Sequence, residues 1–318
     1  MAFLRRVLLS LSVGYVIYFF GERVFWSFAR STELQPENPD SLIGFVFGVI
    51  LYSLFAYIML VIIEYLRVRT VWALFLAGSI FGWLVEGVYA MTFFGGAGIP
   101  LPFSIVWTAV AWHALISVLI GLYYLRISLS DKSFFHTVVI ASALGLFWGV
   151  WALAWVFEEI PLLVTPVEFA THAFIATFFF IIAEWLMTIS RPSEFVSTRV
   201  ERVVLCAIVL LFAGLVTFPV VPFLMPVLVV CFFAAFVPLI LNRKKYDQGH
   251  LLGALGRPVS FIKYSALLCM PAVATLIYAV CNSIGFVFPS NILVFILSSV
   301  LGAGVFVVSV FKVLRHTA

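Results

Sequence analysis

The sequence predicts an all-α polytopic membrane protein with about ten transmembrane helices arranged as five hairpins. Hydrophobic residues make up 64% of its 318 residues and charged residues 10%, against roughly 45–50% and about 25% in soluble domains. Apolar stretches close to the length of a spanning helix, about 20 residues, also recur along the whole chain. Almost nothing is left over for a soluble domain.

The apolar stretches define one integral membrane domain over residues 1–318. Within it, the first hairpin covers residues 1–70, a candidate functional core covers 71–190, and two C-terminal hairpins cover 191–318. The predicted spans are 6–28, 42–65, 71–93, 103–125, 134–157, 166–189, 203–220, 222–241, 264–282 and 291–312.

The basic residues predict the orientation of these spans. Lys and Arg gather in the cytoplasmic loops of membrane proteins. If the N-terminus is cytoplasmic, the inner loops and termini hold 16 of the 18 Lys and Arg residues, and only Arg23 and Arg30 fall outside. We therefore expect a multi-pass protein of the cell membrane with both termini in the cytoplasm and the lipid bilayer as its surroundings.

The second and third hairpins share a pattern that suggests a parallel repeat. Two Gly-x-x-x-Gly pairs, at residues 78–82 and 145–149, are each followed by tryptophan and glutamate. Two His-Ala pairs, at 113–114 and 172–173, each follow a proline by eleven residues. Both copies run in the same direction, unlike the inverted repeats of many secondary transporters.

Three ionisable residues of the candidate core, Glu86, His113 and His172, are the candidate catalytic residues. Ionisable groups inside a bilayer are costly, and they usually face the bundle interior or a cavity and are paired. All three are predicted in the outer half of the third to sixth helices. Carboxylate and imidazole groups can divide acid and base roles or ligate a divalent metal, so a metal at these three residues is a second expectation.

Further residues are predicted to line the same outward-facing cavity: Trp83, Trp112, Trp151, Glu158, Glu159 and Arg23. Of these tryptophans, Trp112 and Trp151 lie too deep for a headgroup belt; the tryptophans could form aromatic walls, although plain packing also explains them. Glu158 and Glu159 could equally be solvated acids at a helix end. Arg23 could pair with Glu86 or with Glu22, or extend to the membrane surface. Thr165 and Glu168 match a capping box and are assigned a structural role.

The Glu/His arrangement over residues 71–190 is loosely similar to that of the CAAX prenyl protease and bacteriocin-processing superfamily. Neither a Glu-Glu-x-x-x-Arg nor a Phe-x-x-x-His motif is present. The resemblance implies that Glu86 is the base that activates water, with His113 and His172 nearby.

Three classes of function remain open. The first is an intramembrane enzyme, hydrolase-like or lipid-modifying, that acts on a lipid or membrane-protein substrate at the Glu/His site. The second is a small-molecule or ion-coupled permease, which proline-containing segments such as residues 218–222 favour. The third is a non-catalytic membrane subunit or assembly factor. Phosphate-binding, dinucleotide-binding and metal-finger motifs are absent, and the basic residues form no patch suited to nucleic acid.

Overall fold

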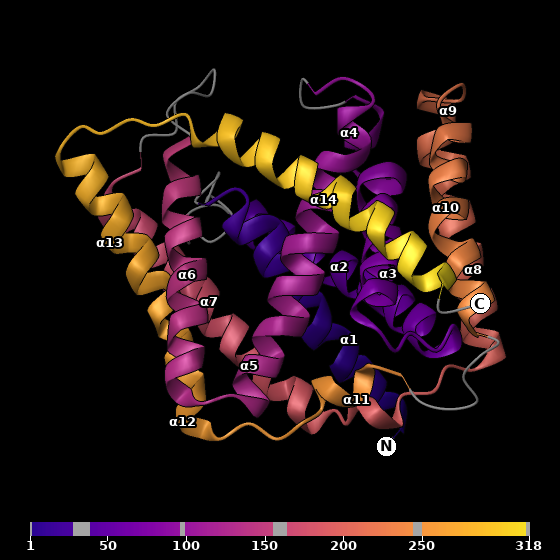
Figure 1. Ribbon diagram of the computed structural model, residues 1–318, viewed down its shortest axis with the longest axis horizontal. Helices are drawn as coiled ribbons and strands as arrows, with labels where there is room; N and C mark the ends of the chain where they lie inside the picture. The colour runs from indigo at the N-terminus through magenta and orange to yellow at the C-terminus, as the bar shows by residue number, and fades with distance from the viewer. Residues whose placement is uncertain (1, 28–38, 96–98, 155–163, 244–249, 316–318) are drawn as a thin grey trace. The chain divides into compact units, whose positions relative to one another are not determined.

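The computed structural model describes residues 2–27, 39–95, 99–154, 164–243 and 250–315, and the regular structure in these ranges is helical throughout (Figure 1). Within the described residues, ten helices are long and apolar enough to cross a bilayer, and each overlaps one predicted span. The predicted all-α, multi-pass architecture is therefore confirmed. The pairing into hairpins and the side of each terminus stay predictions.

The elements fall into α-helices, π-helical segments (η1, η3, η5, η8) and short 3₁₀ turns (η4, η7, η9). The first part of the chain contains α1 (Ala2–Tyr18), η1 (Phe19–Val24), α2 (Pro39–Tyr65), α3 (Val71–Trp83), η3 (Leu84–Tyr89), η4 (Thr92–Phe94), α4 (Phe103–Val106), η5 (Trp107–Tyr124), α5 (Leu125–Asp131), α6 (Phe134–Ala152) and α7 (Pro166–Ile189). The second part contains η7 (Pro192–Glu194), α8 (Arg199–Phe212), η8 (Ala213–Thr217), α9 (Phe218–Val220), α10 (Met225–Arg243), α11 (Leu252–Leu255), α12 (Phe261–Ser265), η9 (Ala266–Leu268), α13 (Cys269–Ser283) and α14 (Ser290–Arg315).

The first and third spans end earlier than the apolar pattern predicts. The first was expected to reach residue 28 and the third residue 93, but η1 ends at Val24 and η3 at Tyr89. Just beyond these ends, Ser27 and Met91 have φ angles of 62° and 59°. A left-handed backbone cannot continue a right-handed helix. The chain therefore turns at both positions, although the sequence is still apolar.

Exposed apolar side chains on α8 and α10 fit a lipid environment. Leu210 of α8 is 72% exposed and Phe233 of α10 is 63% exposed. A soluble protein rarely exposes an extended apolar surface, whereas lipid chains satisfy it. This agrees with an integral membrane protein.

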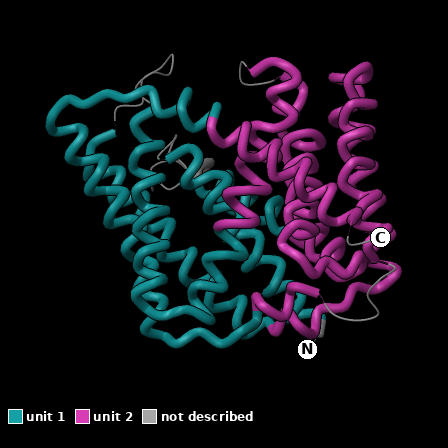
Figure 2. Tube along the Cα trace, in the orientation of Figure 1, with its two compact units in different colours: residues 1–53, 121–190, 256–296 teal, residues 54–120, 191–255, 297–318 magenta. Residues whose placement is uncertain are grey.

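The structure divides into two compact units, which we describe separately (Figure 2). Unit 1 comprises residues 1–53, 121–190 and 256–296, and unit 2 comprises residues 54–120, 191–255 and 297–318. Each unit draws on distant parts of the chain, so neither coincides with one of the three sections read from the hydropathy pattern.

In unit 1, α6 packs against α13 through the second glycine pair. A Cβ atom at Gly149 would lie 2.8 Å from the carbonyl oxygen of Ala274, and one at Gly145 would overlap the carbonyl oxygen of Met270. Small residues allow such close backbone approach between membrane helices. Elsewhere in the unit, α1 packs against α7, and the hydroxyl of Tyr15 donates to the carbonyl of Ala176 at 3.1 Å.

In unit 2, α3 packs against η5 through the first glycine pair. A Cβ atom at Gly78 would lie 3.2 Å from Cα of Ala114, and one at Gly82 would overlap the carbonyl oxygen of Ala109. The first glycine pair thus contacts the next long helix of the chain, whereas the second contacts α13. Both glycine pairs allow close contact between helix backbones, but the helices that they contact are not equivalent.

Capping boxes begin two of the helices. The predicted box at α7 is confirmed, with Glu168 accepting from the backbone of Thr165 at 2.8 Å and Thr165 accepting from Glu168 N at 3.2 Å. A second box, between Thr198 and Glu201, begins α8. Each satisfies helix N–H groups that would otherwise lack partners.

The close approach at Gly82 predicts a stability difference between two glycine-to-alanine variants. We expect Gly82→Ala to destabilise the protein by roughly 1–3 kcal/mol, because the added methyl group would overlap the Ala109 backbone. Gly214→Ala is the matched control, because a Cβ there meets nothing within 4 Å. Thermal unfolding of both purified variants measures the difference, and equal melting temperatures would contradict the close packing.

Candidate acid–base site

Glu86 and His113 form a buried pair within unit 2. Nε2 of His113 lies 2.7 Å from Oε1 of Glu86. The two residues are 7% and 2% exposed. Glu86 comes from η3, which continues α3, and His113 comes from η5. The expected proximity of these two residues, 27 positions apart in the sequence, is therefore present in the structure.

Both carboxylate oxygens of Glu86 have a side-chain partner. His113 occupies Oε1, and the hydroxyl of Thr92 donates to Oε2. Thr92 begins η4, directly after the left-handed turn at Met91. On the other side of the imidazole, the ring of Phe81 packs edge-on with a centroid separation of 5.7 Å. The carboxylate thus has fixed partners, and the imidazole has a fixed plane.

Both members of the pair lie on π-helical backbone. Segments η3 and η5 carry Glu86 and His113, and η8, also π-helical, contacts η3 within the same unit. The hydroxyl of Thr217 in η8 donates to the carbonyl of Val88 in η3 at 2.7 Å. π-Helical turns are rare and occur frequently at functional sites. The backbone around the pair therefore departs from regular α-helix where the ionisable groups lie.

Two of the predicted cavity-lining tryptophans, Trp83 and Trp112, are buried in unit 2. The indole nitrogen of Trp83 donates to the carbonyl of Ile105 at 3.0 Å, and its ring packs edge-on against Phe306 at 5.4 Å. Trp112 packs against Trp107 at 5.8 Å. Both tryptophans are thus packed among other aromatic rings in the interior of unit 2.

His172, Arg23 and Trp151 belong to unit 1, where each has its own partners. Nε2 of His172 lies 3.3 Å from the carbonyl oxygen of Arg23. The guanidinium of Arg23 donates to the hydroxyl of Tyr18 at 2.7 Å and is only 3% exposed, so it does not extend to the surface. The indole of Trp151 donates to the carbonyl of Phe25. Among the described residues of unit 1, the polar partner of His172 is a backbone carbonyl.

Glu158 and Glu159, the other predicted lining residues, lie outside the described residues. The pairing of His113 with Glu86 is therefore the part of the predicted site that the structure brings together.

A divalent metal would need more ligands than the pair offers. Catalytic zinc sites use three protein ligands, and no group of three or more His, Cys, Asp or Glu side chains gathers in the described part of the chain. Glu86 and His113 supply one oxygen and one nitrogen. These two described ligands fall short of the three that a catalytic zinc site uses.

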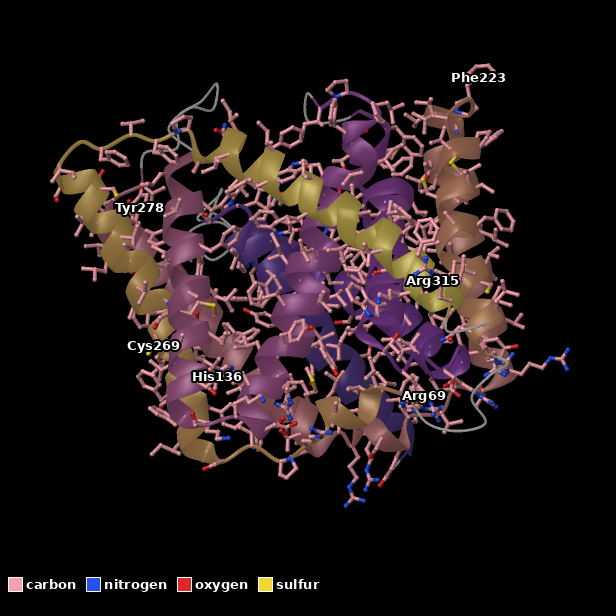
Figure 3. The ribbon with its side chains drawn as sticks, in the orientation of Figure 1. Arg69, His136, Phe223, Cys269, Tyr278 and Arg315 are labelled. Atoms are coloured by element: carbon pink, nitrogen blue, oxygen red, sulfur yellow. The ribbon has the colours of Figure 1, made fainter. Side chains whose placement is uncertain are left out.

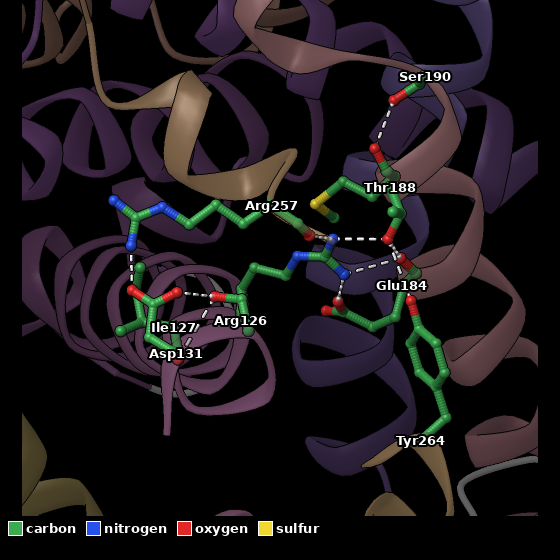
Figure 4. A network of polar contacts seen from close by, with 10 residues as sticks. Arg126, Ile127, Asp131, Glu184, Thr188, Ser190, Arg257 and Tyr264 are labelled. Carbon is green, nitrogen blue, oxygen red and sulfur yellow. Dashed lines mark hydrogen bonds and ion pairs between the residues drawn. The ribbon is translucent and has the colours of Figure 1, made fainter. Parts of the chain in front are cut away.

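A second buried charge pair, Arg126 with Glu184 in unit 1, was not singled out from the sequence (Figure 4). Nη1 of Arg126 lies 2.8 Å from Oε2 of Glu184, and both side chains are fully buried. The same guanidinium donates to the Thr188 hydroxyl at 2.7 Å and to the carbonyl of Arg257 at 3.0 Å. Arg126 thereby connects α5 with α7 and with the segment that precedes α12.

The sequence contains a signal for this pair, although the same arginine also fits the distribution of basic residues on the cytoplasmic side. Arg126 is one of the 16 Lys and Arg residues that the loop pattern places on the inner side, and Glu184 lies in a span near the same side. Both lie inside apolar spans, Phe103–Asp131 and Pro166–Ile189, and opposite charges inside two spans near the same membrane face are expected to pair. A second contact, between Arg257 and Asp131, ties the same segment to the end of α5.

Neutralising Glu184 is expected to destabilise the protein strongly. In Glu184→Gln, the buried Arg126 charge loses its counter-ion, which typically costs about 3–5 kcal/mol. Glu194→Gln is the matched control, because the Arg191–Glu194 pair is more than half exposed on both sides and such pairs contribute about 0–1 kcal/mol. Thermal unfolding in detergent compares the two variants. Similar melting temperatures would show that Arg126 does not depend on Glu184.

Comparisons of the chain with protein-family models, with curated proteins and with solved structures find no match. The case for a function therefore comes from the contacts of the described residues.

Proposed function

We propose that this protein is an intramembrane enzyme that uses Glu86 and His113 as an acid–base pair on a lipid or membrane-protein substrate. The observation that carries the proposal is the buried 2.7 Å contact between the carboxylate and the imidazole. Proteins usually retain ionisable groups inside the membrane at sites of function. Here two such groups from different helices meet in the same unit.

The chemistry of the pair follows from its geometry. A carboxylate hydrogen-bonded to one imidazole nitrogen fixes the orientation of the ring and stabilises the imidazolium that forms when the ring takes up a proton. Thr92 holds the second carboxylate oxygen, which keeps Glu86 in this role. The pair can then accept a proton from a reacting group and return it later, a contribution of about 10²–10⁴ in rate.

The proline-containing segment gives the permease alternative less support than its sequence suggested. Transporter sites often use helices that are broken near the middle of the membrane. Pro219 and Pro222 lie instead where one span ends at Val220, and Pro226 lies at the start of α10. These prolines mark the turn between two spans. An enzyme is therefore the function that we propose.

We also propose that the protein resides in the cell membrane with both termini in the cytoplasm, so that the pair is reached from the outer leaflet. The support is the placement of 16 of the 18 Lys and Arg residues on one side by alternate loops. A lipid or a membrane-protein segment entering from the outer leaflet could approach this half of the protein without crossing the headgroups of the inner leaflet.

Substitutions of the pair should abolish activity without unfolding the protein. The wild type, Glu86→Gln and His113→Asn are reconstituted in vesicles of total lipid extract from the expression host, and the lipids are compared by mass spectrometry after incubation. We expect products from the wild type and rates lower by about 10²–10⁴ in both variants, because each loses the proton-transfer partner.

Glu194→Gln, at an exposed ion pair, is the control and should retain the wild-type rate. His172→Asn, measured alongside, reports whether the histidine of unit 1 contributes. Product formation by Glu86→Gln at the wild-type rate would rule out the acid–base role. Reduced melting temperatures in both pair variants, with no product from the wild type, would favour a purely structural pair.

Reporter fusions test the orientation. We expect alkaline phosphatase to be active when fused after Val221, in the turn between two spans, and inactive when fused after Arg257. A C-terminal fluorescent protein that matures only in the cytoplasm should fluoresce. The reverse pattern at these three positions would contradict the orientation inferred from the basic residues.

A further inference from the structure

Three helix ends in unit 2 bring two arginines onto one tyrosine ring. Tyr65 ends α2, Arg202 lies in the first turn of α8, and Arg243 ends α10. The guanidinium carbon of Arg202 lies 4.7 Å from the centroid of the Tyr65 ring, and that of Arg243 lies 4.0 Å from it. The two guanidinium carbons are therefore no more than 8.7 Å apart, the total of these two distances.

Among the described residues, no carboxylate contacts this cluster directly, and Glu64 is linked to Arg202 through the Ser197 hydroxyl. Glu64 accepts from the backbone and hydroxyl of Ser197, at 3.3 and 2.6 Å, and Glu201 accepts from the backbone of Thr198 at 2.6 Å. Among the described residues, neither Arg202 nor Arg243 forms an ion pair with a carboxylate. Two arginines and one linked carboxylate leave the described cluster with a net positive charge, which favours an anion.

Hydrogen bonds hold Arg202 in place, whereas no described residue accepts a hydrogen bond from the guanidinium of Arg243. Nη1 of Arg202 donates to the carbonyl and the hydroxyl of Ser197 at 2.8 and 2.9 Å, so its plane is fixed. The contact of Arg243 within the described residues is the face of Tyr65. Tyr65 is 39% exposed, so the cluster is open to solvent or to lipid headgroups. It is a partly pre-organised set of donors with an accessible face.

The position of the cluster indicates what kind of anion it meets. All three residues lie at the ends of membrane-spanning helices, which is where lipid headgroups lie. Arg67, Arg69 and Arg199 belong to the same helix ends and short connections, and Figure 3 shows nitrogen-tipped side chains around the labelled Arg69. Clusters of basic residues beside spans attract anionic lipids, and guanidinium groups match phosphate oxygens with paired hydrogen bonds.

We propose that Arg202, Tyr65 and Arg243 form a binding site for the phosphate group of an anionic membrane lipid. The two guanidinium groups donate to the phosphate oxygens, and the Tyr65 ring holds them at the spacing that this requires. The site is separate from Glu86 and His113 in its residues and its chemistry, so it does not depend on the proposed catalytic function.

Native mass spectrometry of the purified full-length protein tests the site, with phosphatidylglycerol as the anionic probe and phosphatidylcholine as the zwitterionic one. Arg202→Gln/Arg243→Gln should weaken phosphatidylglycerol binding by roughly tenfold to thirtyfold, since each basic residue near a membrane surface contributes about a fivefold effect. Arg191→Gln/Arg315→Gln removes the same charge elsewhere on unit 2 and should bind as the wild type does. Equal binding by the two double variants overturns the proposal.

Two further arms keep the result unambiguous. If the double variant is unfolded, Arg243→Lys and Tyr65→Leu are measured instead, since the first keeps the charge and the second keeps both arginines. Weaker phosphatidylglycerol binding in either supports the site, and wild-type binding in both overturns it. Millimolar inorganic phosphate is the last probe. If it binds as tightly as phosphatidylglycerol and with the same dependence on Arg202 and Arg243, the site takes free phosphate and the assignment to lipid fails.

Discussion

Pairing of buried charge is the constraint on which the rest of this structure depends. An isolated ion in an apolar interior costs several kcal/mol even after relaxation. In unit 1, Arg126 and Glu184 meet at 2.8 Å with both side chains fully buried. In unit 2, His113 and Glu86 meet at 2.7 Å. Each contact joins two different spans, so the helix packing of each unit must satisfy ionisable groups as well as bury apolar surface.

Glycine is what allows the pair in unit 2 to form. Gly82 lies one turn before Glu86, and its missing side chain lets α3 approach the backbone of η5 at Ala109. Ala109 in turn lies one turn before His113. Gly78 faces Ala114 while Gly82 faces Ala109, so the two helices run in opposite directions and Glu86 and His113 lie on opposite sides of the level of Gly82. The close approach of the backbones lets the two side chains reach each other across it. The same small-residue principle holds α6 against α13 in unit 1, where no ionisable pair accompanies it among the described residues of these two helices.

The number and position of the spans could be predicted because hydropathy and helix length are local properties of the sequence. The ends near Ser27 and Met91 could not, since a left-handed backbone at a non-glycine residue leaves no pattern in an apolar stretch. Residue type and depth were enough to pick out Glu86 and His113. The contact of Arg126 with Glu184 was missed because an arginine near the membrane surface is interpreted first as a residue of a cytoplasmic loop. Only its burial distinguishes it, and burial depends on the packing of other helices.

The network around Arg126 has a consequence for how the chain is made. Its guanidinium contacts residues of α5 and α7 and the carbonyl of Arg257 (Figure 4), a position that leaves the ribosome some 130 residues after Arg126 itself. The ion pair can therefore close as soon as α7 enters the bilayer, while the final hydrogen bond waits for the segment before α12. In an assembly that follows synthesis, the α12–α13 region would dock onto a charge that has already been neutralised.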